Sequence, residues 1–219
     1  MKNPKFELFD VLPFDTRPHT AHELALAQCG AQTLRVIRTF KDVDEVVKDI
    51  ISDNGPGECN SALEDALKKS AVYCEWQNSM PFLKDVPNIH SYRVKPKKKN
   101  NAALINDELI KFGGLLPKGQ VLFRGGLFAK SDIDITCGPV STTTMPSVAR
   151  WHAIEVKGQI AIFDIEDNLK IHAYAFKTWG NQKLKHEYEV LLQNNIRLTF
   201  KGSNTYGNME VYRYNVRLA

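Results

Sequence analysis

Several patterns with a direct functional meaning are missing from this sequence. Its 219 residues contain only four cysteines, with no C-x-x-C pair and no cysteine–histidine cluster, so we expect reduced thiols and no zinc site. It has no Rossmann or P-loop glycine pattern, which excludes those two modes of nucleotide binding. No apolar run approaches the ~18–20 residues of a membrane helix, and the first residues lack the apolar region of a secretory signal. We therefore expect a soluble protein that is cytosolic or delivered by other machinery.

The composition is that of an ordinary globular protein. Hydrophobic residues make up 43% and charged residues 25% of the chain, and this length is enough for a substantial buried core. The formal net charge of +4 is mildly basic. It permits an acidic or polyanionic partner without requiring one.

The first half of the chain has the spacing of amphipathic helices. Thr20 followed by Glu23, and Ser61 followed by Glu64, predict capping boxes at the starts of two of them. Pro, Gly and polar clusters separate the segments. The predicted helices are 20–40, 43–51, 61–78 and 102–112.

From Gly119 onward the sequence changes to short apolar segments separated by turns. Such segments predict strands. The fold class expected is therefore α+β, with helices before the strands. The predicted elements are strands at 121–124, 160–163 and 170–176, a helix at 146–152, and a closing hairpin of 196–200 with 209–217.

The loop-rich link of residues 80–100 carries a run of cations beside Tyr92. Such a run is suited to phosphates, and the tyrosine to stacking on a base, so nucleic-acid contact is one hypothesis. A solvated basic loop is the alternative. The cations are Arg93, Lys95, Lys97, Lys98 and Lys99.

Arg124 ends the predicted strand 121–124 and is followed by two glycines. A buried arginine must meet an anion, because burying it alone is very costly. Its forked donors suit a phosphate. An ion pair with Glu187 or Glu189 is the alternative role.

Two glutamates lie two residues apart in the segment 185–192, which we interpret as a strand. Like charges this close repel each other. The pair is therefore either solvated and incidental, or placed at the mouth of a cleft where it acts on an electron-poor group. The predicted faces are Glu187, Glu189 and Leu191 on one side and Tyr188, Val190 and Leu192 on the other.

Three short motifs occur in one order: Phe123-Arg124-Gly125, Ser141-Thr142-Thr143, and Glu187-Tyr188-Glu189-Val190-Leu191-Leu192. Their order and spacing resemble the R-S-E class of mono-ADP-ribosyltransferases, which includes bacterial toxins, plant-pathogen effectors and phage enzymes. The resemblance covers roughly residues 100–219. One position departs from the family pattern, since the usual Ser-Thr-Ser is Ser-Thr-Thr here.

The resemblance implies a division of the chain and a fold. The catalytic core would be residues 101–219, built from two small, mainly antiparallel sheets packed face to face with NAD in the cleft between them. Residues 1–100 would form a helical region packed on that core. NAD would serve as a substrate, and no metal is implied.

The resemblance also implies roles for four side chains. Glu189 would stabilise the cationic ribose of the transition state, and Glu187 would meet the incoming nucleophile. Arg124 would hold the NAD diphosphate. Ser141 would orient Glu189 and line the nicotinamide side.

Further residues are implied in binding. The Gly125 backbone would contact the nicotinamide amide, and Thr142 and Thr143 would line the NAD site. Phe176 and Trp179 lie in the polar loop before the paired glutamates, which corresponds to the segment that recognises the acceptor.

Three functions remain open from the sequence. The first is ADP-ribose transfer to an arginine of a target protein, the second is the same chemistry on a nucleic-acid acceptor, and the third is a non-catalytic nucleotide- or RNA-binding module. A toxin or effector of this kind would act in the cytoplasm of its own or a target cell. The resemblance also implies an inhibitor or antitoxin as a partner, although no residue shows one.

Overall fold

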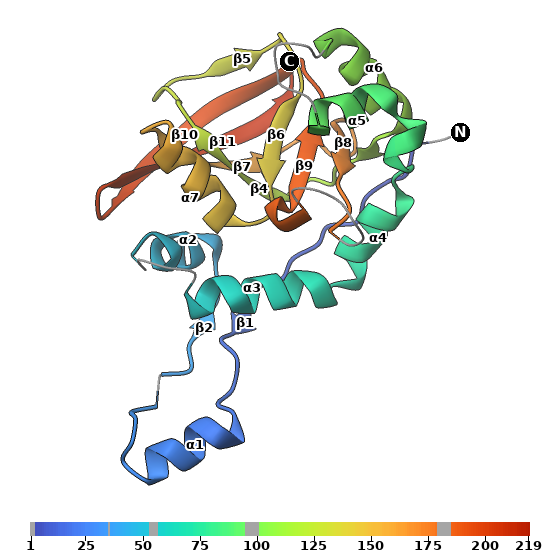
Figure 1. The fold of residues 1–219 in the computed structure, drawn as a ribbon. Helices are drawn as coiled ribbons and strands as arrows, with labels where there is room; N and C mark the ends of the chain where they lie inside the picture. The colour runs from blue at the N-terminus through green and yellow to red at the C-terminus, as the bar shows by residue number, and fades with distance from the viewer. Residues whose placement is uncertain (1–2, 35, 53–56, 95–100, 179–184) are drawn as a thin grey trace.

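Most of the helices lie in the first half of the chain and most of the strands in the second, as expected for an α+β fold (Figure 1). The structure is a computed structural model, and it describes every residue except 1–2, 35, 53–56, 95–100 and 179–184. Within the described residues, none of the helices has the length and apolar character needed to cross a membrane. The helices are α1 (Ala21–Gln28), α2 (Val43–Ser52), α3 (Glu58–Lys69), α4 (Ala71–Ser79), η1 (Leu83–Asp85), α5 (Pro87–Val94), α6 (Ala102–Phe112), α7 (Pro146–Glu155) and η3 (Lys185–Glu187).

Three of the predicted helices, 43–51, 102–112 and 146–152, are confirmed as α2, α6 and α7. The single helix predicted over 61–78 is wrong, because the chain turns at Ser70 between α3 and α4. The Ser70 side chain accepts a hydrogen bond from Tyr73 N at 3.2 Å and so caps α4. Ser61, predicted as a cap, lies inside α3.

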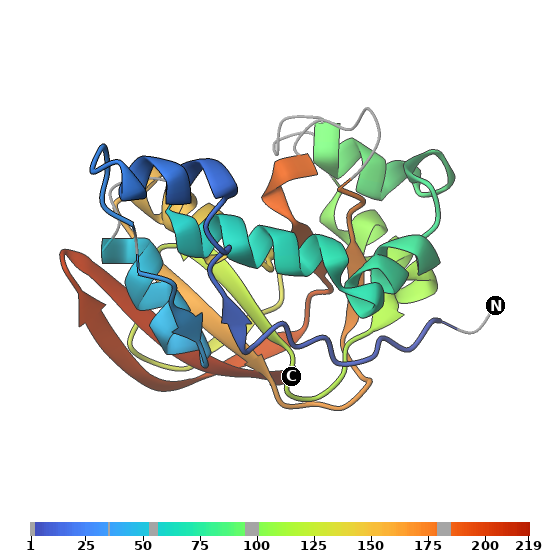
Figure 2. The ribbon, with the colours of Figure 1, turned by 90° about the horizontal axis from the view of Figure 1, so that it is seen from below.

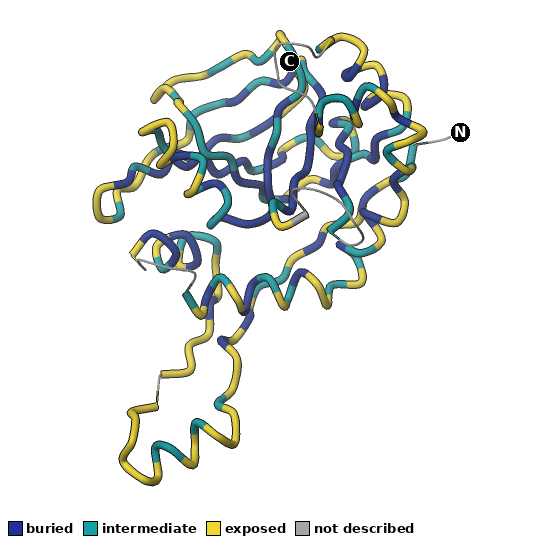
Figure 3. Tube along the Cα trace, in the orientation of Figure 1, coloured by how far each residue is buried: buried dark blue, intermediate teal, exposed yellow. Residues whose placement is uncertain are grey.

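The helix predicted over 20–40 is also wrong in length. Its capping box of Thr20 and Glu23 is present, but α1 ends at Gln28, and Gly30 follows with φ +68°. No residue of α1 is buried, and the helix lies at the far end of an arm that projects from the body (Figures 1 and 3). Most of the stability of a helix in a protein comes from packing an apolar face, and α1 has no buried face that would stabilise further turns. Strands β1 (Phe14–Asp15) and β2 (Thr39–Phe40) pair at the base of the arm.

Nine strands form one mixed, mainly antiparallel sheet in the order β3-β8-β9-β6-β4-β7-β11-β10-β5. The resemblance implies two separate sheets, whereas the hydrogen bonds join these strands into one sheet. The halves β3-β8-β9-β6 and β4-β7-β11-β10-β5 meet through one residue pair, Phe123 with Thr143. The strands are β3 (Gly114–Leu115), β4 (Val121–Gly126), β5 (Ile133–Ile135), β6 (Val140–Thr143), β7 (Gln159–Ile165), β8 (His172–Ala175), β9 (Glu189–Leu192), β10 (Ile196–Tyr206) and β11 (Met209–Leu218).

The main hydrophobic core joins residues from both sides of the boundary placed at residue 100. Seen from below, α3 lies across the strands (Figure 2). Trp76 of α4 stacks on Phe6 with ring centroids 4.4 Å apart, and Tyr73 stacks on Tyr188 at 6.4 Å. The N-terminal helices thus pack directly beside the strand β9 that carries Glu189.

Candidate active site

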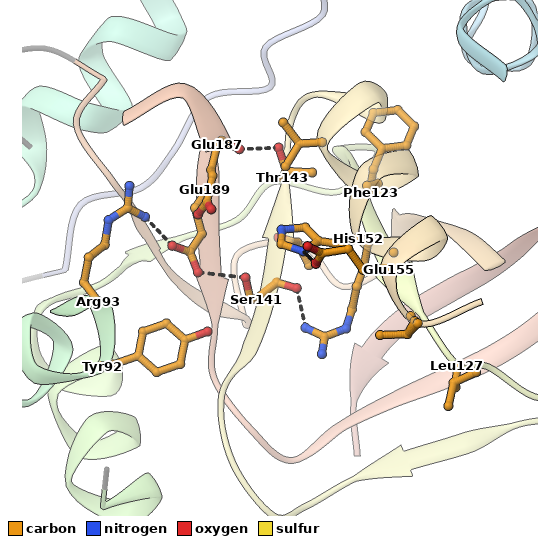
Figure 4. Close-up of a pocket in the computed structure, with 17 residues that line it drawn as sticks. Tyr92, Arg93, Phe123, Leu127, Ser141, Thr143, His152, Glu155, Glu187 and Glu189 are labelled. Carbon is orange, nitrogen blue, oxygen red and sulfur yellow. Dashed lines mark hydrogen bonds and ion pairs between the residues drawn. The ribbon is translucent and has the colours of Figure 1, made fainter. Parts of the chain in front are cut away.

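A cleft of about 560 Å³ opens where the two halves of the sheet meet. Its walls come from α5, β4, β6, α7, η3 and the start of β9 (Figure 4). This volume lies in the range of small-molecule sites, about 300–1,000 Å³. The cleft is lined by Arg124, Ser141, Glu187 and Glu189 together with Tyr92, Arg93, Phe123, Gly125, Gly126, Leu127, Thr142, Thr143, Val148, Ala149, His152, Glu155 and Val156.

Glu189 is the first residue of β9, and its side chain is only 8% exposed. β9 pairs with β6, and Ser141 Oγ donates a hydrogen bond to Glu189 Oε1 at 2.7 Å. Arg93 Nη1 of α5 donates to the other oxygen, Glu189 Oε2. The carboxylate is therefore held at both oxygens, by a strand on one side and a helix on the other (Figure 4).

The sequence suggested that Glu187 and Glu189 share one face of a strand, and this prediction is wrong. Glu187 ends the short helix η3, and Tyr188 takes a left-handed conformation with φ +48° before β9 begins. Two hydrogen bonds hold this turn, from Thr143 Oγ1 to Glu187 O at 2.6 Å and from Thr144 N to Tyr188 O at 3.2 Å. Both glutamates still line the cleft. The turn at Tyr188 brings Glu187 there, and not the alternation of side chains along a strand.

The surroundings of Glu187 favour its protonated form. Burial raises its pKa, and the nearby Glu189 carboxylate raises it further. Arg93, His152 and His186 oppose the shift by their positive charge. A half-buried glutamate with a raised pKa, in a cleft, is the kind of group that proton-transfer sites use.

Arg124 lies on β4 and lines the cleft. Its Nη1 donates to the Ser141 carbonyl oxygen. Burial lowers the pKa of this guanidinium, and the Tyr92 hydroxyl and Glu189 oppose that shift. Within the part of the chain that the structure describes, Arg124 forms no ion pair with either glutamate, so that alternative role is not observed.

The residues flanking these groups have structural tasks. Thr142 Oγ1 donates to Val190 O at 2.6 Å and ties β6 to β9. Thr143 Oγ1 also accepts from Met145 N at 3.0 Å, at the start of α7. A Cβ on Gly125 would lie 1.9 Å from the Ala149 carbonyl oxygen, so this glycine allows α7 to pack tightly on β4.

Two cleft residues come from a helix that the sequence did not reveal. Tyr92 and Arg93 lie in α5, within the segment interpreted as a loop. Ile89 and Arg93 are four residues apart and both are buried, a helical spacing that could have predicted that Arg93 faces inward. Burial and the charge of Glu189 raise the pKa of Tyr92.

The hypothesis of a basic nucleic-acid surface is wrong for Arg93. Its side chain is 2% exposed and pairs with Glu189, so it is not available to phosphates at the surface. Lys95, Lys97, Lys98 and Lys99 lie outside the described residues.

The prediction that Phe176 contacts the acceptor is also wrong. Its ring is 1% exposed, and the Arg93 guanidinium carbon lies 4.2 Å from its centroid. A ring buried under another side chain cannot meet a macromolecular acceptor. Trp179, the other residue predicted for that role, lies outside the described residues.

The cleft offers donors and carboxylates for an organic ligand. Among the described residues, no group of three His, Cys, Asp or Glu side chains is arranged to hold a metal ion. The polar groups that converge are Arg124, the paired glutamates and the Ser141 hydroxyl. Such a set can bind an anion at one point and stabilise a positive charge at another.

No family model matches the sequence, and no curated protein matches it. Solved structures of bacterial ADP-ribosyltransferases match across most of the chain. Three of the matching structures are the toxin Vis from Vibrio splendidus (14% identity, 82% of this chain and 88% of that chain, TM-score 0.36), an ADP-ribosyltransferase from Clostridium botulinum (15%, 81% and 96%, 0.38) and an ADP-ribosyltransferase toxin from Paenibacillus larvae (13%, 73% and 96%, 0.40).

Proposed function

We propose that this protein is a mono-ADP-ribosyltransferase, which transfers ADP-ribose from NAD to an acceptor and releases nicotinamide. The observation that carries the proposal is the meeting of Arg124, Ser141, Glu187 and Glu189 around one cleft. These side chains come from the strands β4, β6 and β9 and from the short helix η3, and they lie up to 65 residues apart in the sequence. The motifs that resemble the R-S-E class therefore line one cleft, which supports the proposal.

The reaction breaks the bond between nicotinamide and its ribose. Positive charge develops on the ribose, as in the oxocarbenium-like transition state of glycoside hydrolysis. A carboxylate held in place beforehand stabilises that charge without reorganising. Glu189 takes this role, and the 2.7 Å hydrogen bond from Ser141 keeps the carboxylate in place.

Arg124 holds the NAD diphosphate. A guanidinium has five donors, and the hydrogen bond to the Ser141 carbonyl uses Nη1, which leaves Nε and Nη2 for the phosphate oxygens. The Gly125 backbone, next on β4, contacts the nicotinamide amide. Nicotinamide leaves as a neutral molecule from a cationic ring, so the bond cleavage needs no metal in this scheme.

Glu187 receives the acceptor, which we propose to be an arginine side chain of a target protein. A carboxylate pairs well with a guanidinium, and its charge orients the attacking nitrogen toward the ribose carbon. The new C–N bond forms as the ribose–nicotinamide bond is lost, and the acceptor nitrogen gives up one proton. The raised pKa of Glu187 suits it to accept that proton.

The test is incubation of the purified protein with labelled NAD, with and without cell lysate. Nicotinamide release measures bond cleavage, and label retained on macromolecules measures transfer. Separate digestion of the labelled products with protease and with nuclease identifies the acceptor class. Label that protease releases and nuclease does not is the expected result. The absence of nicotinamide release would contradict the proposal.

A further inference from the structure

Helix α5 brings a second arginine to the proposed site. Arg93 lies 96 residues before Glu189 in the sequence, and its guanidinium reaches the carboxylate from the opposite side to Ser141 (Figure 4). α5 belongs to the N-terminal half of the chain, outside the three motifs. The position of this arginine therefore calls for its own explanation.

Arg93 is fixed by contacts on two sides. Its Nη1 pairs with Glu189 Oε2, and its guanidinium carbon lies over the Phe176 ring, 4.2 Å from the ring centroid. The side chain is 2% exposed. A buried guanidinium that lies over a ring and is paired with a carboxylate has little freedom to rotate.

The start of α5 is fixed as well. The Glu108 carboxylate of α6 accepts hydrogen bonds from Asn88 N at 3.0 and 3.1 Å, from Asn88 Nδ2 at 2.6 Å and from Ile89 N at 2.9 Å. These are the free N–H groups of the first turn, where negative charge is favourable. The first turn of α5 is tied to α6, and its last turn places Arg93 against Glu189 of β9.

The charge of Arg93 suits the carboxylates in the cleft. Glu187 and Glu189 repel each other, and burial raises the pKa of Glu187 together with that repulsion. Arg93 on α5, His152 on α7 and His186 on η3 act in the opposite direction. Of these three, Arg93 is the one that contacts Glu189.

We infer that Arg93 is a positioning residue for Glu189: it holds one carboxylate oxygen while Ser141 holds the other, so that the carboxylate faces the ribose in one orientation. The inference rests on the proposed function. A carboxylate oxygen has two lone pairs, so Oε2 keeps a place for the ribose hydroxyl beside Arg93. Helix α5 is then part of the proposed site rather than only a scaffold beside it.

The test compares Arg93→Gln and Arg93→Lys with wild type in nicotinamide release from NAD. Arg93→Gln is expected to lower kcat by about 10²-fold, the effect of a 1 Å misplacement, with little change in the KM for NAD. Arg93→Lys keeps the charge and loses the planar fork, so its kcat should lie between the two. Arg213→Gln is the matched control, since Arg213 pairs with Asp164 and Asp44 away from the cleft, and its kcat should equal that of wild type.

Each variant is measured beside its folded fraction, from near-ultraviolet circular dichroism at the assay temperature. A kcat loss no larger than the loss of folded protein would overturn the inference, and so would wild-type or higher turnover in either Arg93 variant. If Arg93→Gln does not fold, Arg93→Lys is judged by the same criterion. If wild type releases nicotinamide and the Arg93 variants release it at the same rate, the inference is refuted and the proposed function is not. No turnover in wild type refutes the proposed function and the inference with it.

Discussion

Gly125 gives a sharp test of how the cleft is built. In Gly125→Ala the new Cβ would lie 1.9 Å from the Ala149 carbonyl oxygen and 2.5 Å from Ala153 N. Both atoms belong to the backbone of α7, so neither can rotate away as a flexible side chain does. The helix and β4 must separate by roughly 1.5 Å to restore ordinary contact.

The cost follows from what that separation disturbs. Ala149 and Ala153 are fully buried against β4. Overpacking of a well-packed core costs about 1–3 kcal/mol, and we expect the upper end because backbone is displaced. For a chain of this size, about 3 kcal/mol lowers the melting temperature by roughly 6–12 °C. Arg124 is the preceding residue on β4, so its misplacement by about 1 Å should cost about 10²-fold in turnover.

The measurements are thermal unfolding and nicotinamide release. Gly126→Ala is the matched control, because a Cβ there would meet the Phe128 ring at 3.4 Å, an ordinary contact. We expect it to unfold within a few degrees of wild type. Equal melting temperatures for the two alanine variants would refute the account of how α7 packs on β4.

Three further predictions concern carboxylates. Glu187→Gln should keep nicotinamide release and lose transfer to a small guanidino acceptor, and loss of both activities would contradict the division of roles. Acid protonates Glu187, whose pKa is raised by burial and by Glu189, so in wild type transfer should fall at a higher pH than the ordinary glutamate value of about 4.3, as a pH–rate profile would show. Glu108→Gln should cost about 1–3 kcal/mol in urea unfolding, because an amide nitrogen would face the donors of Asn88 and Ile89. An unchanged unfolding midpoint would contradict the anchoring of α5.

The sequence predicted which side chains line the cleft better than it predicted the backbone that carries them. Arg124 and the two glutamates stood out because a buried arginine and paired carboxylates are costly wherever they have no task, whereas Ser141 was named from the resemblance alone. The turn at Tyr188 could not be foreseen. It depends on hydrogen bonds from Thr143 and Thr144, which are distant in the sequence.

Arg93 was missed for a similar reason. Four lysines follow it between residues 95 and 99, so composition favoured a solvated loop. The spacing of Ile89 and Arg93 was the one signal that Arg93 faces inward, and packing over the Phe176 ring bears that signal out. The helices show the same limit. α2 and α6 each have an apolar face and were predicted correctly. The break at Ser70 and the early end of α1 depend on the tertiary contacts of each segment, which the local sequence does not reveal.

The most direct test of the central claim is nicotinamide release by Glu189→Gln. The amide keeps the shape of the side chain and removes its charge, so we expect turnover to fall by about 10²–10³-fold while NAD still binds. Glu210→Gln is the control, since Glu210 forms an exposed ion pair with Lys130 outside the cleft, and its turnover should match wild type. Wild-type turnover in a folded Glu189→Gln protein would contradict the claim that this carboxylate stabilises the ribose cation.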